Sequence, residues 1–167
     1  MLKRFMPKRL RALAFIPASM ILLLGCGQDA EVNETPAAAP ATPAPAPGLE
    51  RQPAPEGAAA YIIEPADGAV VSNPVRVLFG LRGFGVVPAG IERADAGHHH
   101  LLIDTDLPNL DLPIPADDNH VHFGGGQTET ELTLEPGTHT LQLLLGDELH
   151  VPHDPPIASQ RITIEVR

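Results

Sequence analysis

Residues 128–145 read TETELTLEPGTHTLQLLL, and this stretch decides the fold class. On both sides of a turn at Glu135–Thr138, apolar leucines alternate with polar or charged residues. Alternation with a period of two is typical of a β-strand that buries one face, and a Pro-Gly pair marks a turn. The stretch therefore predicts two short antiparallel strands rather than a helix.

The same pattern recurs along residues 61–167, where no long helical periodicity occurs. Further strands are expected at 61–63, 75–79, 98–104, 120–123 and 161–166, with a loop at 105–119. About seven short strands separated by turns favour an all-β, immunoglobulin-like sandwich, with a jelly-roll or small barrel as the alternative. The motif at 65–77 also resembles the first hairpin of many bacterial immunoglobulin-like envelope domains.

Residues 1–25 have the composition of a secretory signal, with a basic start and an apolar core at 13–24. The apolar run is too short for a comfortable transmembrane span, which is the competing interpretation. The segment ends in Leu23-Leu24-Gly25-Cys26, which resembles the lipobox of bacterial lipoproteins. The resemblance implies cleavage before Cys26 and acylation of this residue. Gly27 stands where an aspartate would retain such a lipoprotein in the inner membrane, so the expected location is the outer membrane, facing the periplasm.

Residues 26–60 are predicted to be a disordered linker, rich in Pro and Ala, and residues 61–167 the β-sandwich domain. A Pro-rich chain favours extended, polyproline-like conformations. At about 3 Å per residue, such a linker could hold the domain some tens of ångströms from the membrane.

The charge of the chain after cleavage excludes several partners. Cleavage of the signal would remove five of the 11 basic residues and none of the 21 acids, which leaves a net charge of 6 − 21 = −15. An acidic surface repels nucleic acid and attracts cations. The cleaved chain would also have no methionine and no thiol except that of Cys26, so a disulfide within it is excluded.

All eight histidines lie between residues 98 and 153. Because alternate residues of a strand share a face, two pairs could each present two imidazoles to a metal ion: His98 with His100, and His120 with His122. In a sandwich, the loop between the last two strands would approach the start of the strand at 98–104. The preferred metal site therefore consists of His98, His100, His150 and His153, and a second candidate cluster of His120, His122 and His139.

The competing interpretation is that the histidines are structural. His99 and His139 share faces with leucines of their strands and are expected to be core-edge residues bonded to the backbone. A hydrogen-bond network could account for the preferred cluster as well.

The donor set restricts any metal ion to a short range. Imidazole ligands suit Cu(II), Zn(II) and Ni(II), and the lack of soft sulfur ligands argues against a Cu(I) or blue-copper site. We therefore expect Cu(II) or Zn(II), bound by neutral imidazoles and released as pH falls through about 6.5. The acids at 104–111 lack the spacing of a calcium-binding loop and are expected to be solvated.

The motifs GHHHLLID at 97–104 and HFGGGQTE at 122–129 resemble a bacterial family of uncharacterised envelope proteins. Its members carry this module as a domain of unknown function, and the resemblance covers nearly all of 75–166. It implies that the histidines belong to a recurring pattern, without assigning an activity.

Three classes of function follow. The first is a lipid-anchored module that binds a divalent transition metal. The second is an immunoglobulin-like adhesion or scaffolding module for an envelope protein or glycan, whose histidines are structural. An enzyme is the least favoured: His120-x-His122 resembles the paired copper ligands of copper–zinc superoxide dismutases, but the disulfide of those enzymes is absent. Ser72 and Ser159, the serines beyond the signal, lie in no nucleophile elbow.

Overall fold

The computed structural model describes residues 49–167. The predicted signal peptide, the lipidation site at Cys26 and most of the predicted linker lie outside the described residues. Within the described residues the chain is all-β, and no helix is long and apolar enough to cross a membrane. The expected fold class is thus confirmed.

Some strands are longer and others shorter than predicted, each by a few residues, and the structure adds two short edge strands. The strands are β1 (Ala59–Glu64), β2 (Val70–Val71), β3 (Val75–Arg82), β4 (Gly85–Val86), β5 (Ala96–Ile103), β6 (His120–His122), β7 (Glu129–Leu132), β8 (Gly137–Gly146) and β9 (Ile162–Val166).

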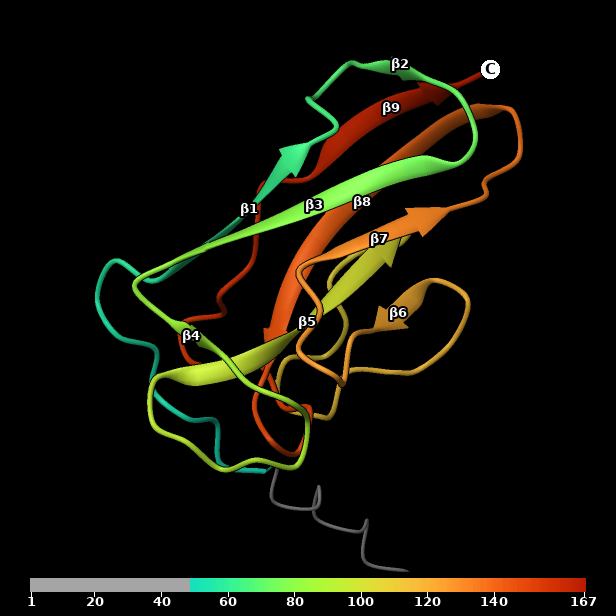
Figure 1. The fold of residues 1–167 in the computed structure, drawn as a ribbon. Helices are drawn as coiled ribbons and strands as arrows, with labels where there is room; N and C mark the ends of the chain where they lie inside the picture. Colours follow the sequence, from blue (N-terminus) through green and yellow to red (C-terminus); the bar gives the residue numbers. More distant parts are fainter. Residues whose placement is uncertain (1–48) are drawn as a thin grey trace, which may run out of the picture. The chain divides into compact units, whose positions relative to one another are not determined.

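The strands form two sheets, which Figure 1 shows as two layers. One has the order β1-β3-β7, and the other has the order β2-β9-β8-β5-β4, with β6 also paired to β5. These orders match the A-B-E and G-F-C arrangement of an immunoglobulin-like sandwich. The sheets do not close into a barrel, so the sandwich and not the barrel alternative describes the fold.

The main core lies between the two sheets. It contains Val77 and Phe79 of β3, Leu101 of β5, and Leu141 and Leu143 of β8, all at most 5% exposed. The spacing of two along each strand sends these side chains to the same face. The period of two in the sequence thus predicted which face of each strand is buried.

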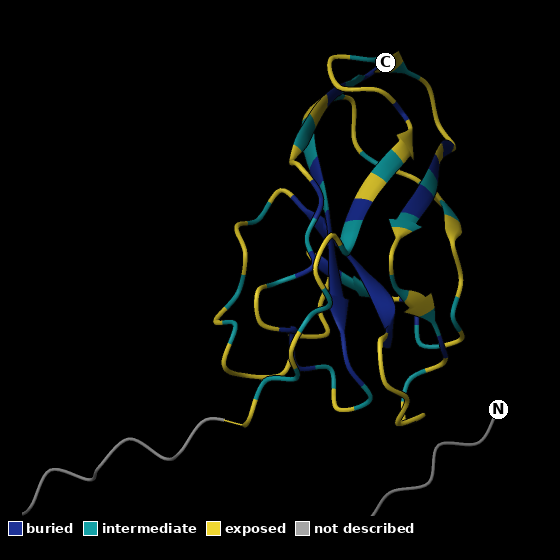
Figure 2. Ribbon diagram, turned by 90° about the vertical axis from the view of Figure 1, so that its left-hand side faces the viewer, coloured by how far each residue is buried: buried dark blue, intermediate teal, exposed yellow. Residues whose placement is uncertain are grey.

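Strand β5 differs from the others because all eight of its residues are buried (Figure 2). A strand that buries both faces needs a cover on the side away from the core. Two loops provide this cover: the one between β5 and β6, which contains Ile114, and the one between β8 and β9, which contains His150. The Ile114 N–H donates a hydrogen bond of 2.9 Å to the His150 carbonyl and so joins the two loops. A small apolar cluster of Leu102, Ile114 and Leu144 lies beneath them.

Part of the predicted linker packs against the domain. Residues 51–54, which we call the strap, lie beside residues 148–154: Ala54 and Gln52 exchange backbone hydrogen bonds of 2.8 Å with Asp154. The Arg51 guanidinium donates to the carbonyls of Pro152 and His153. The contacts of the domain thus begin about ten residues before the predicted boundary at residue 60.

Candidate metal centre

Four imidazoles converge on the outer face of the larger sheet. Each offers one ring nitrogen, and these nitrogens all lie within 4.8 Å of one another. We call this group the histidine cluster; its members are His98, His100, His122 and His150. No other group of three or more His, Cys, Asp or Glu residues in the described part of the chain is arranged to hold a metal ion.

Strand β5 contributes the first two imidazoles. His98 and His100 alternate with His99 and Leu101, which face the core, so both point to the outer face, with ring centroids 4.8 Å apart. The neighbouring strand leaves room for them, because His98 is paired with Gly146 of β8. A Cβ atom on Gly146 would lie 3.1 Å from the ring of His100 and 3.0 Å from the backbone of His150.

The antiparallel pairing of β6 with β5 brings in the third imidazole. In this register His122 lies directly opposite His100, with ring centroids 5.0 Å apart and ring planes inclined by 28°. Gly124 makes room for the His122 ring, since a Cβ atom there would lie 2.4 Å from a carbon of the imidazole. The glycine run after β6 thus allows the ring to fold over the chain.

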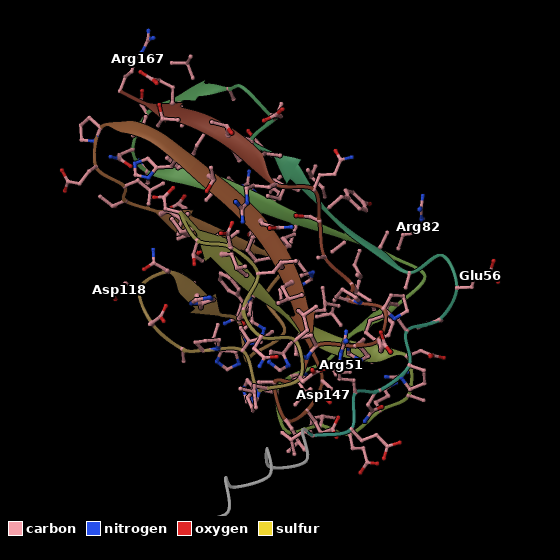
Figure 3. All side chains as sticks on the ribbon, turned by 180° about the vertical axis from the view of Figure 1, so that it is seen from behind. Arg51, Glu56, Arg82, Asp118, Asp147 and Arg167 are labelled. Atoms are coloured by element: carbon pink, nitrogen blue, oxygen red, sulfur yellow. The ribbon has the colours of Figure 1, made fainter. Side chains whose placement is uncertain are left out.

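A tight loop after β8 presents the fourth imidazole. The buried carboxylate of Asp147 accepts hydrogen bonds from the N–H groups of Leu149 (2.9 Å) and Val151 (2.8 Å). His150 between them donates its own N–H to the Asp147 carbonyl (3.0 Å) and has a positive φ of 68°. A non-glycine residue in this conformation is held by its surroundings and is often found at functional sites. Figure 3 shows Asp147 and Arg51 at the same end of the molecule.

The two cluster members on β5 are buried and have no hydrogen-bond partner among the described residues. His98 is 0% and His100 is 1% exposed, and neither ring nitrogen of either residue has a partner among the described residues. Burial, followed by the neighbouring imidazoles, lowers the pKa of His98 to about 4 and that of His100 to about 2. Burial and His150 also lower the pKa of His122. These rings are therefore neutral at pH 7, with a lone pair free on each.

The cluster differs from the predicted site at one position. The structure brings His98, His100 and His150 together as expected, but places His122 beside them and His153 elsewhere. The His153 ring lies against Phe84 with centroids 4.8 Å apart, and near Gly97, whose position in β5 faces the core side. A period of two sends Gly97 and His98 to opposite faces of the sheet, so His153 lies on the wrong face to join the cluster.

The second predicted cluster is not assembled either. His122 lies beside His100, whereas His120 is one cross-strand pair further along, opposite Leu102, with its Nδ1 2.8 Å from Asp117. His139 bonds to the Asp104 carboxylate (2.6 Å) and the Glu135 carbonyl (2.8 Å). Both ring nitrogens of His139 are thus occupied by protein groups, as expected of a structural histidine.

His99, the remaining histidine, is in the core. It is 0% exposed and packs against the ring of Phe79, with centroids 5.3 Å apart. Burial lowers its pKa to about 4. The backbone of Gln127 acts in the opposite direction on this pKa, in line with the expected contact to the backbone, although neither ring nitrogen meets full hydrogen-bond geometry.

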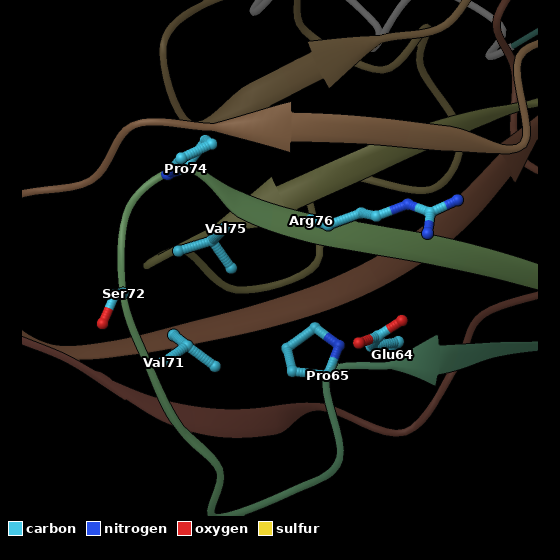
Figure 4. Close-up of a pocket in the computed structure, with 7 residues that line it drawn as sticks. All are labelled: Glu64, Pro65, Val71, Ser72, Pro74, Val75 and Arg76. Atoms are coloured by element: carbon cyan, nitrogen blue, oxygen red, sulfur yellow. The ribbon is translucent and has the colours of Figure 1, made fainter.

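A surface pocket at the opposite end of the sandwich has a different character (Figure 4). It lies where the chain turns from β1 through β2 into β3, and Val71 of β2 pairs there with the end of β9. The pocket is lined by Glu64, Pro65, Val71, Ser72, Pro74, Val75 and Arg76. Without histidine or cysteine, it lacks the ligands that transition metals prefer.

Comparison with known proteins identifies one family. A family model described as "Domain of unknown function (DUF4399)" matches residues 77–167, which is more than half of the chain. The match includes all four members of the histidine cluster. No curated protein and no solved structure matches the chain.

Proposed function

We propose that this chain, which belongs to the DUF4399 family of domains of unknown function, binds a divalent transition metal ion through its histidine cluster. The observation that supports this proposal is the convergence of four imidazoles, two of them fully buried without hydrogen-bond partners. Burying a polar group without a partner costs about 1–3 kcal/mol. An ion bound by one nitrogen of each ring would remove that cost at the ligating atoms.

The spacing of the nitrogens suits an ion of the size of Cu(II) or Zn(II). At about 2.0–2.1 Å from a tetrahedral zinc, four nitrogens lie about 3.3 Å apart. The nitrogens of the cluster lie within 4.8 Å of one another, so binding requires an inward movement of at most about an ångström for each nitrogen. His122 and His150, which are the less buried members, have the freedom to make it.

The donor set favours Cu(II) or Zn(II) over other ions. All four donors are neutral imidazole nitrogens, which suit these ions and Ni(II), whereas Mg²⁺ and Ca²⁺ prefer oxygen. The net charge of −10 for the whole chain attracts cations in general.

We place this activity in the bacterial cell envelope. The support is the sequence: the signal-like residues 1–25, the lipobox-like segment ending at Cys26 and the Pro/Ala-rich linker that follows. A lipid anchor would hold the domain on the membrane, and the expected orientation faces the periplasm.

Isothermal titration calorimetry of the untagged full chain tests the metal proposal. In a Cys26→Ser background, which removes the one thiol, Cu(II) or Zn(II) should bind at one site per chain with a Kd below about 10 μM, or about −7 kcal/mol. Absence of binding at this level for Cu(II), Zn(II) and Ni(II) would favour the alternative, an adhesion or scaffolding module with structural histidines.

Two buried histidines provide a matched pair for locating the site. His98→Ala removes a cluster member and should weaken binding at least 100-fold. His153→Ala removes a histidine that is as buried but lies on the other face of β5, and should leave the Kd within about threefold. An equal loss of affinity in the two variants would restore the site predicted from the sequence, which contains both histidines, and an unchanged Kd in His98→Ala would contradict the histidine cluster as the site.

A further inference from the structure

The four members of the histidine cluster differ in their accessibility. His98 and His100 are buried, His150 is half-buried and His122 is exposed. One side of the site is therefore closed by β5 and the other is open to solvent. An incoming ligand can reach the ion only from the side of His122 and His150.

The two sides also differ in how firmly they are held. His98 and His100 lie on β5, which is hydrogen-bonded to β8 on one side and to β6 on the other. His122 ends a strand of three residues and is followed by Gly124-Gly125-Gly126. A short edge strand opens locally at a lower free-energy cost than a central strand does.

The main hydrophobic core and the histidine cluster lie on opposite faces of the larger sheet. The main core lies between the sheets and contains apolar residues of β3, β5, β8 and β9, whereas the cluster lies on the outer face of the larger sheet. In contrast, structural zinc sites hold together domains that have little core of their own. None of the four ligands neutralises the charge of a dication, since each is a neutral imidazole, so the bound ion would keep its full positive charge.

We propose that the metal ion is an exchangeable cargo, which enters and leaves through the His122–His150 side while His98 and His100 hold it. This inference rests on the proposed function and specifies it: the domain carries or buffers a divalent transition metal instead of being stabilised by it. Exchange is associative: a nitrogen or oxygen of an acceptor ligand binds the ion and displaces the neutral imidazole of His122 before the ion leaves the protein.

Metal transfer to a chromophoric chelator tests the proposal. The full chain in the Cys26→Ser background is loaded with one equivalent of Zn(II) or Cu(II) and mixed with 4-(2-pyridylazo)resorcinol in a stopped-flow instrument. The observed rate should increase in proportion to chelator concentration and transfer should finish within seconds. A rate independent of chelator concentration would overturn the inference and leave the proposed function standing, whereas failure to load the protein would contradict the proposed function itself.

Variants at the open side distinguish this route from others. His122→Ala should retain binding through three imidazoles and release the ion at least tenfold faster. Gly124→Ala should displace the His122 ring, because the new Cβ would meet it at 2.4 Å, and should speed release at least threefold. Gly125→Ala is the matched control, since its Cβ would touch the flexible end of Gln127 and should leave the rate within twofold. Equal rates for all three variants and the parent would overturn the proposal.

The metal-free protein provides an independent readout. After dialysis against EDTA, the chain should keep its β-type circular dichroism spectrum and unfold cooperatively. Added metal should raise the Tm only by the amount that binding to the folded state produces. An unfolded metal-free chain would show that the ion is structural and would contradict the cargo interpretation.

Discussion

At the scale of single residues, the distinctive feature is that both buried imidazoles of the histidine cluster have no hydrogen-bond partner among the described residues. Buried polar groups in native proteins are almost always hydrogen-bonded, and the exceptions call for an explanation such as an ion. His98 and His100 together leave four ring nitrogens unpartnered within the described chain. The lowered pKa values of both rings also mean that protons compete weakly with a metal ion. The sequence-based expectation that binding weakens below about pH 6.5 therefore shifts to a lower pH.

Asp147 is the residue that positions the fourth imidazole. Asp147→Ala removes the acceptor of two loop N–H groups and should destabilise the fold by about 1–3 kcal/mol. It should also weaken metal binding about 10- to 100-fold, as loss of a residue that orients a ligand does. Urea unfolding and calorimetry measure the two effects.

Two further variants test whether this role is positional. Asp147→Asn keeps an acceptor oxygen and should recover most of the metal affinity. Asp118→Ala, at an exposed position on another loop, should change neither quantity. If Asp147→Ala binds metal as tightly as the parent, His150 is not held by this loop geometry.

At the scale of elements, β5 organises the site through two of the strands that pair with it. Its pairing with β8 places His98 beside Gly146, and its pairing with β6 places His122 beside His100. A shift of either register by one residue would send the histidines to the opposite face. The imidazoles are therefore brought together by hydrogen bonds between backbones and not by contacts among the rings.

His139, near the start of β8, ties this strand to the chain just after β5 and should make stability depend on pH. Its two partners, a carboxylate of Asp104 and a carbonyl of Glu135, are both acceptors, so the bonded ring is the protonated one. Asp104 raises the pKa of His139, followed by the Glu135 carbonyl. The stabilisation is thus fully present below the unfolded pKa of about 6.5 and is lost as pH rises through the raised value.

Asp104→Asn tests this connection, because asparagine tolerates the positive φ of 55° and keeps an oxygen for the N–H of Thr140. The variant should be less stable than the parent by about 0.5–1 kcal/mol at pH 5.5. The difference should shrink at pH 8.5, where less of His139 is protonated. Urea unfolding at the two pH values measures it, and a difference that grows with pH would contradict the assignment.

At the scale of the whole molecule, burial of the histidine triplet makes the metal-free fold sensitive to acid. The pKa values of His98 and His99 are lowered to about 4 and that of His100 to about 2, against about 6.5 in the unfolded chain. Between pH 6.5 and 4 the unfolded state therefore binds more protons. Stability should be fully present above pH 6.5 and should fall as pH decreases.

Urea unfolding in EDTA between pH 4.5 and 7.5 measures this dependence. The free energy of unfolding should rise with pH up to about 6.5, below the pH range in which His139 loses its proton. His99→Leu should reduce the slope of the unfolding free energy against pH by the equivalent of about one bound proton. It removes one buried titrating group, which packs against Phe79 outside the cluster. A profile that is flat, or that falls with pH, would show that the buried rings are charged in the folded state.

The local sequence determined the strands and their buried faces. The alternation in 128–145 predicts β7 and β8, and the alternation in 75–79 predicts the core side of β3, because side-chain direction in a strand depends only on position along the chain. The same period of two correctly placed His98 and His100 on one face. The turns between these segments could be predicted equally well, since Gly and Pro favour turns through their own backbone conformations.

The membership of the cluster was decided only by tertiary structure. Whether His122 or His153 joins His98 depends on the register of β6 against β5 and on the path of the loop after Gly146. Both are set by pairing between segments far apart in the chain, which no local pattern encodes. The sequence alone thus determined that paired imidazoles would lie on a strand of a sandwich. Backbone hydrogen bonds between distant strands decided which of them meet, because these bonds fix register and register fixes the face.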